Sequence, residues 1–154
     1  EVRPADACVV LCPQEVDPGT EDVSALAERV DREAHRARAA FGLAPEDLGV
    51  ISPYGAQVRW LREEIGRDDV EVDTVDGFQG REKQAIILSL VRSNPLGDVG
   101  FLADVRRMNV ALTRAKRLLI VIGDSATLGH HPFYQRLLTR FEVAGAYHTV
   151  WEDV

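Results

Sequence analysis

Two stretches of this sequence decide its fold: Val72–Arg92, VDTVDGFQGREKQAIILSLVR, and Gly100–Asp124, GFLADVRRMNVALTRAKRLLIVIGD. Each stretch places polar, glycine-containing sequence beside an apolar run of strand length. Such runs are typical of strands buried on both faces of a parallel sheet, and phosphate-handling loops commonly lie at the ends of these strands. The chain contains no G-x-x-x-x-G-K-[ST] loop to cradle phosphates. The two stretches therefore predict an α/β nucleotide-handling domain with half of a catalytic site.

Strand and helix patterns alternate on both sides of these stretches. Apolar runs predict strands at Ala7–Cys12, Leu48–Ile51, Val70–Val72, Ala85–Val91, Leu118–Ile122 and Tyr147–Trp151. Apolar residues spaced three and four apart predict helices at Val23–Phe41, Ser52–Ile65, Ala103–Ala115 and Phe133–Val143. Repeated alternation of this kind predicts a doubly wound, mainly parallel sheet with helices on both faces.

Composition limits the class of protein. A chain of 154 residues, 45% of them hydrophobic, fits one domain, and its first residue, Glu1, suggests a domain of a longer polypeptide. The net charge of −7 argues against a protein that coats duplex nucleic acid, although basic residues gather between Arg106 and Arg117. No apolar run approaches the roughly 20 residues of a membrane span. The spacing of Cys8, Cys12 and the histidines predicts no metal site. We expect a soluble, cytoplasmic, monomeric domain.

Two groups of residues are candidates for chemistry. In open α/β sheets ligands bind at the carboxyl ends of strands, which favours Thr74–Gly80, whose glycines permit close backbone approach. An ordinary polar turn would have the same composition. Arg107 and Arg114 are seven residues apart, so on the predicted helix Ala103–Ala115 they would share one face and could meet an anionic ligand. Alternatively, these arginines pair with carboxylates such as Asp104 on a solvated face.

The two stretches resemble motifs V and VI of superfamily 1 helicases, in the branch that includes the RNA helicase of nonsense-mediated decay, senataxin and many bacterial relatives. VDTVDGFQGRE resembles motif V, RRMNVALTRAK resembles motif VI, and GVISPYGAQ, at Gly49–Gln57, resembles motif IV. The three occur in the family order. The resemblance implies that residues 1–154 form the second RecA-like domain of such a helicase, with motif IV at about 49–57, motif V at 72–92 and motif VI at 100–117.

The resemblance also implies roles for single residues. Arg114 matches the arginine finger that reaches the γ-phosphate of ATP, and Gly80 and Glu82 match residues near the phosphates and the ribose. Arg107 is assigned to the same nucleotide site, although bracing of the helix against motif V is the preferred alternative. The residues assigned to the nucleic acid are Thr74 in motif V, and Ser52, Tyr54 and Gln57 in motif IV.

The partners follow from the same resemblance. ATP and Mg²⁺ would be held mainly by a first RecA-like domain, and single-stranded DNA or RNA would pass over this one. The sequence does not choose between DNA and RNA. This chain alone is predicted to have negligible ATPase activity. The alternative is a non-catalytic nucleic-acid-binding or protein-interaction module, which would be expected to carry damaged motifs.

Overall fold

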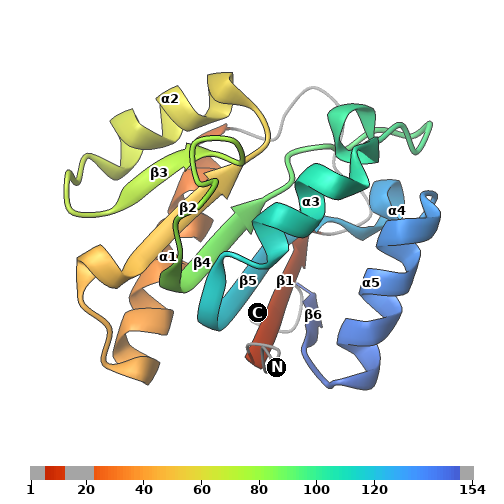
Figure 1. The fold of residues 1–154 in the computed structure, drawn as a ribbon. Helices are drawn as coiled ribbons and strands as arrows, with labels where there is room; N and C mark the ends of the chain where they lie inside the picture. The colour runs from red at the N-terminus through yellow and green to blue at the C-terminus, as the bar shows by residue number, and fades with distance from the viewer. Residues whose placement is uncertain (1–5, 13–22, 150–154) are drawn as a thin grey trace.

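A computed structural model describes the backbone of residues 6–12 and 23–149 and the side chains of residues 32–149. One parallel sheet runs through the molecule in the strand order β3-β2-β4-β5-β1-β6 (Figure 1). Its strands are β1 (Asp6–Cys12), β2 (Leu48–Ser52), β3 (Glu71–Thr74), β4 (Lys83–Ser89), β5 (Ala115–Asp124) and β6 (Tyr147–Thr149). The predicted α/β fold with a parallel sheet is therefore confirmed.

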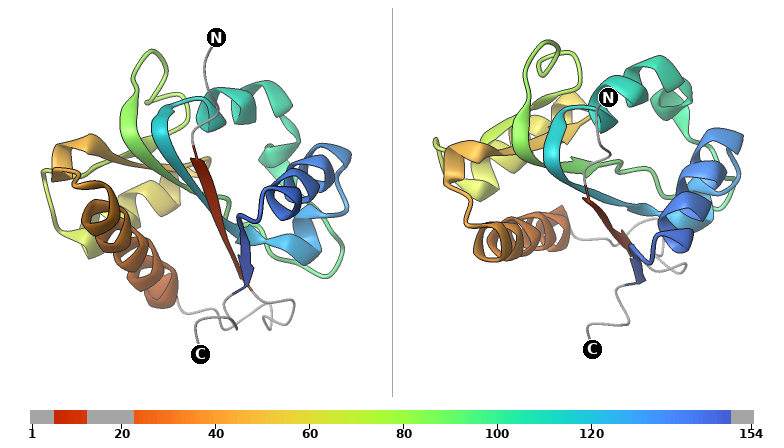
Figure 2. Two further views of the ribbon diagram at one scale, coloured as in Figure 1. Left: turned by 90° about the horizontal axis from the view of Figure 1, so that it is seen from below. Right: turned by 60° about the horizontal axis from the view of Figure 1, so that its bottom comes forward.

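Helices cover both faces of this sheet (Figure 2). They are α1 (Val23–Phe41), α2 (Gly55–Ile65), α3 (Val105–Leu112), α4 (Ser125–Leu128) and α5 (Pro132–Val143), with 3₁₀ turns η1 (Pro45–Asp47) and η2 (Gly100–Ala103). Successive residues of a strand point to opposite faces. Ala85 and Ile87 of β4 accordingly join the core under α1 and α2, whereas Ile86 and Leu88 join the core under α3 and α5. Burial on both faces explains the apolar run that the sequence shows there.

The predicted helix Ala103–Ala115 is wrong at both ends. Asp104 caps α3, since its carboxylate accepts the backbone N–H of Arg107 at 3.2 Å. At the other end, the Thr113 hydroxyl donates to the carbonyl of Asn109 at 2.9 Å, and α3 ends at Leu112. Arg114 therefore lies in the turn before β5 and does not share a helix face with Arg107.

Other boundaries differ from the prediction by a few residues. Strand β5 is longer than predicted, and β4 both begins and ends two residues earlier. Val91, beyond the end of β4, has a φ of 64°, a left-handed conformation that no strand contains. Ser52 completes β2, so α2 begins at Gly55, and helix α4 was not predicted. Of the predicted strand Tyr147–Trp151, Trp151 lies outside the described residues.

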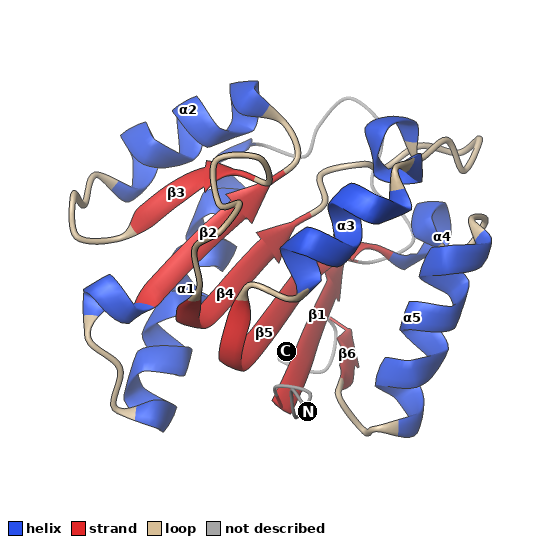
Figure 3. Ribbon diagram, in the orientation of Figure 1, coloured by secondary structure: helices blue, strands red, loops and turns tan. Residues whose placement is uncertain are grey.

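The segment from residue 75 to 82 is here called the crossing loop. It runs from the end of the sheet where the strands finish, here called the carboxyl edge, to the end where the strands begin, here called the amino edge. It leaves β3 after Thr74 at the carboxyl edge and enters β4 at Lys83 at the amino edge, over the face that α3 covers (Figure 3). Phe78 is fully buried and anchors the loop in the core. Gly49 of β2 leaves room for this ring, because a Cβ there would lie 2.9 Å from it. A loop without a helix therefore makes the connection.

Candidate functional site

Arg114 lies at the amino edge of the sheet, at the start of β5. Its Nε donates to the carbonyl of Val110 at 3.1 Å, Nη1 to the carbonyl of Arg81 at 3.3 Å, and Nη2 to the Thr113 hydroxyl at 3.2 Å. All three acceptors are neutral. No carboxylate in the described chain forms an ion pair with Arg114. The side chain is thus held in place while its charge stays available to an anion.

Gly80 and Glu82 lie beside Arg114, at the end of the crossing loop. The backbone N–H of Lys83, which follows Glu82, donates to the carbonyl of Arg114 at 3.1 Å. Gly80 has a φ of 79°, and the space where a side chain would stand is open. Glu82 is exposed and forms no hydrogen bond or ion pair with the described residues. Its carboxylate is free to accept hydrogen bonds from hydroxyl groups of a ligand.

Arg107 lies on α3 and faces the crossing loop. Its Nη2 is 3.3 Å from Oδ2 of Asp76, so the side chain connects motif VI to motif V, as the bracing alternative predicts. An open cleft of about 260 Å³ separates the two elements; it is lined by Val75, Asp76, Gln79, Asp104, Arg106, Arg107 and Val110. The assignment of Arg107 to the nucleotide stays a prediction.

Two of the residues assigned to nucleic acid are partly exposed at the carboxyl edge. The Thr74 hydroxyl accepts the backbone N–H of Gly77 at 3.2 Å. The Tyr54 ring lies 5.8 Å from that of Phe101, which is 68% exposed. The Tyr54 hydroxyl is buried without a hydrogen-bond partner among the described residues, and this burial raises its pKa. Phe101 was not singled out from the sequence.

The other two residues assigned to nucleic acid are buried. Ser52 is fully buried, and its hydroxyl accepts the backbone N–H of Tyr54 at 3.2 Å. Gln57 is 8% exposed, and its Nε2 donates to the hydroxyl of Ser89 at 3.0 Å. Either side chain would have to become exposed before it could contact nucleic acid directly. In this structure the two side chains support the carboxyl edge from within.

The candidate residues thus divide into two groups at opposite edges of the sheet. The sequence placed Thr74–Gly80 together at the carboxyl ends of strands. Instead, the crossing loop takes Gly80 and Glu82 to the amino edge, where they meet Arg114, and leaves Thr74 at the carboxyl edge with Tyr54. The physical reason is that β3 and β4 are parallel, so their connection must traverse the sheet.

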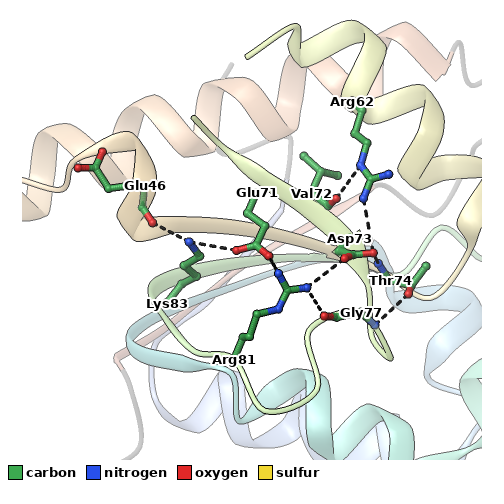
Figure 4. Close-up of polar contacts among 9 residues, drawn as sticks. All are labelled: Glu46, Arg62, Glu71, Val72, Asp73, Thr74, Gly77, Arg81 and Lys83. Atoms are coloured by element: carbon green, nitrogen blue, oxygen red, sulfur yellow. Dashed lines mark hydrogen bonds and ion pairs between the residues drawn. The ribbon is translucent and has the colours of Figure 1, made fainter. Parts of the chain in front are cut away.

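One polar cluster was missed by the sequence analysis. Glu71 and Asp73 of the edge strand β3 both form ion pairs with Arg81 of the crossing loop (Figure 4). Residues two apart on a strand point to the same side. The spacing of the two acids, together with a nearby arginine, was the signal that could have indicated the cluster.

No group of three or more histidine, cysteine, aspartate or glutamate side chains in the described part of the chain could hold a metal ion. Likewise, none of the helices described here combines the length and the apolar character that crossing a membrane requires.

Comparison with known proteins identifies the family. The sequence profile of a family described as "AAA domain" matches residues 9–126, and the chain belongs to this family. It is 48% identical over 113 residues to the DNA-binding protein SMUBP-2 of Rattus norvegicus, covering 72% of this chain. It is 46% identical over 111 residues to a regulator of nonsense transcripts 1 homolog of Neurospora crassa, covering 66%. An uncharacterized ATP-dependent helicase of Methanocaldococcus jannaschii is 53% identical over 91 residues, covering 58%.

These relatives are much longer proteins. The chain spans 11%, 10% and 13% of their lengths, respectively. Among solved structures, the C-terminal domain of a possible DNA helicase from Lactobacillus plantarum matches with a TM-score of 0.62 and 13% identity. The match covers 93% of this chain and 84% of the other. It confirms the predicted α/β fold of RecA-like type, and the relatives agree with the resemblance to helicases drawn from the motifs.

Proposed function

We propose that this chain is the second RecA-like motor domain of an ATP-dependent superfamily 1 helicase or translocase that moves along single-stranded DNA or RNA. The observation that carries the proposal is the state of Arg114, whose guanidinium is fixed by three neutral oxygens and has no carboxylate partner among the described residues. The relatives named as a DNA-binding protein and as an ATP-dependent helicase support the same assignment.

The amino edge fits the part of a nucleotide site that a second domain contributes. ATP with Mg²⁺, held mainly by a first domain, supplies the phosphoryl group when bound. Arg114 stabilises negative charge on the oxygens of that group, the role of an arginine finger, which is commonly worth a factor of about 10³ to 10⁵ in rate. Glu82 accepts hydrogen bonds from ribose hydroxyls, and the open space at Gly80 lets the ligand approach the backbone.

The carboxyl edge takes the nucleic acid in this proposal. Thr74 and Tyr54 contact the nucleic acid, while the Ser52 hydroxyl accepts the backbone N–H of Tyr54 and Gln57 donates to the Ser89 hydroxyl of β4. The crossing loop joins Thr74 to Glu82 and so connects the two edges covalently. Opening and closing of the interface between this domain and the first domain would then change the contacts with the nucleic acid in each cycle of ATP hydrolysis.

The test is the ATPase activity of the full polypeptide that carries both proposed domains, in the presence of single-stranded DNA or RNA. Arg114→Ala should lower kcat about 1,000-fold, because the transition-state charge loses its guanidinium partner. Arg136→Ala, which removes an exposed arginine of α5, is the matched control and should leave kcat unchanged.

The isolated chain provides a second measurement. We expect negligible ATP turnover from residues 1–154 alone. Robust turnover that survives Arg114→Ala would contradict the proposal. A full polypeptide that binds single strands but hydrolyses no ATP would favour the non-catalytic module instead.

A further inference from the structure

We propose that Arg81 is a positioning residue for Arg114. The side chain of Arg81 fastens the end of the crossing loop to the edge strand β3, and its backbone carbonyl then receives the Arg114 guanidinium. This inference rests on the proposed function. Arg81 stands between Gly80 and Glu82 in the sequence, and its side chain points to Glu71 and Asp73 of β3 (Figure 4).

The contacts of the Arg81 side chain are made to β3 and to its own loop. Nη1 forms an ion pair with Glu71, and Nη2 lies 3.1 Å from Oδ2 of Asp73 and donates to the carbonyl of Gly77. The guanidinium carbon stands 5.0 Å from the centre of the Phe78 ring, the core anchor of the loop. A planar fork with several N–H donors suits this set of acceptors, and a lysine does not reproduce it.

The two acids of β3 are held independently of Arg81. Asp73 accepts the backbone N–H of Thr74 at 2.8 Å and lies 3.5 Å from Nη2 of Arg62 on α2. Lys83 Nζ lies 3.1 Å from Glu71 and also donates to the carbonyl of Glu46 at 2.8 Å. The acceptors are thus fixed from α2, β4 and η1, and Arg81 attaches the loop to a rigid base.

Asp73 also lies directly against the crossing loop. A Cβ at Gly77 would stand 2.2 Å from Cγ of Asp73, so the carboxylate occupies the place of a side chain there. This close packing leaves the loop little freedom to shift sideways while Arg81 is bound. Loss of Arg81 would remove the ion pairs that draw the loop toward β3.

The backbone of Arg81 transmits this position to Arg114. The N–H of Arg81 donates to the carbonyl of Phe78 at 3.0 Å, and the carbonyl of Arg81 accepts from Nη1 of Arg114 at 3.3 Å. Two residues further, the Lys83 N–H donates to the Arg114 carbonyl at 3.1 Å. A shift of the loop end therefore displaces one of the three acceptors that orient the guanidinium.

A role in orientation fits the exposure of Arg81 better than a role in stability. Its side chain is 46% exposed, and ion pairs at such positions contribute little to folding. Catalysis is more sensitive to position than folding is, because a misplacement of about 1 Å can cost roughly 100-fold in rate.

The experiment measures ATPase rates of the full polypeptide with both proposed domains. Arg81→Ala should lower kcat by about 10- to 100-fold, and Arg81→Lys by less, since a lysine retains one ion pair. Arg136→Ala is the control, because Arg136 is an exposed arginine of α5 that forms none of the contacts holding Glu71, Asp73 or the crossing loop. It should leave kcat within about twofold of wild type, the small effect typical of an exposed side chain away from the site.

A double substitution tests whether Arg81 acts through Arg114. In the Arg114→Ala background, adding Arg81→Ala should change kcat by no more than about twofold, since residues that act as one unit are not additive. Equal losses in both backgrounds would overturn the inference, as would wild-type activity of Arg81→Ala. If Arg114→Ala itself has no effect, the proposed function fails, which is a separate result. Unfolding curves of Arg81→Ala and Arg81→Lys that match wild type establish that the rates belong to folded protein.

Discussion

Charged side chains at the two edges of the sheet differ in their partners: Asp124 at the carboxyl edge is paired within the fold, whereas Arg114 and Glu82 at the amino edge pair with no opposite charge among the described residues. At the carboxyl edge, Asp124 is 7% exposed and accepts hydrogen bonds from the Ser93 hydroxyl at 2.8 Å, the Thr127 hydroxyl at 2.7 Å and the Ala126 N–H at 2.9 Å. At the amino edge, Arg114 has neutral partners and Glu82 has no partner in the described chain.

This difference separates side chains that hold the fold from side chains that are left for a ligand. A buried polar group that lacks a partner costs free energy, so Asp124, Ser89 and Ser52 at the carboxyl edge are paired within the fold. The Tyr54 hydroxyl and Oε1 of Gln57 are the exceptions among the described side chains. Arg114 is partly exposed and Glu82 is exposed, so both charges remain in contact with water and cost little when they lack an opposite charge. Three predictions test the comparison through the free energy of unfolding.

The largest effect is expected at Asp124. Asp124→Ala should lower the free energy of unfolding by about 3 kcal/mol, because three donors lose a charged acceptor and α4 loses its cap. Urea unfolding of the chain measures the change. Asp124→Asn retains an acceptor oxygen and should lose about half as much. A loss below about 1 kcal/mol for Asp124→Ala would show that water replaces the carboxylate and that this edge is less closed than its burial indicates.

A smaller effect is expected at Ser89, which is fully buried. Ser89→Ala removes the acceptor of Gln57 Nε2 and should cost about 1 to 2 kcal/mol. The double variant Ser89→Ala with Gln57→Leu removes both partners and should recover most of the loss, because no buried donor is then left unpaired. Failure of the double variant to recover would place the cost in packing and not in the hydrogen bond.

The smallest effect is expected at the amino edge. Glu82→Gln should change the free energy of unfolding by no more than about 0.5 kcal/mol, as is usual for an exposed side chain without partners. The same urea experiment applies, with wild type measured in parallel. A loss above about 1 kcal/mol would mean that Glu82 supports the fold, and the contrast between the edges would not hold.

Local sequence patterns were sufficient to predict most of the elements. The apolar runs predicted β4 and β5, because strands buried on both faces need apolar residues at successive positions. The three- and four-residue spacing predicted α1 with the bounds that the structure gives it. The helix around Arg107 was predicted too long, since side-chain caps at Asp104 and Thr113 outweigh the continuing apolar pattern.

The sequence identified candidate site residues but not where they lie in the fold. The motif resemblance pointed to Arg114, Glu82 and Thr74, and their functional roles stay predictions. It did not reveal that Ser52 and Gln57 are buried, because burial depends on neighbours from other strands, such as Ser89. It also passed over Arg81, whose contacts reach back to Glu71 and Asp73 on β3.

The sequence by itself determined that strands and helices alternate and that the strands lie in one buried parallel sheet, because hydrophobic periodicity is a local property of the chain. Only the tertiary structure decided which edge each candidate residue occupies. The crossing loop must traverse the sheet to join two parallel strands, and its end meets Arg114 through a hydrogen bond between residues 33 positions apart. This bond and two others hold the Arg114 guanidinium by neutral oxygens, so its charge has no carboxylate partner among the described residues.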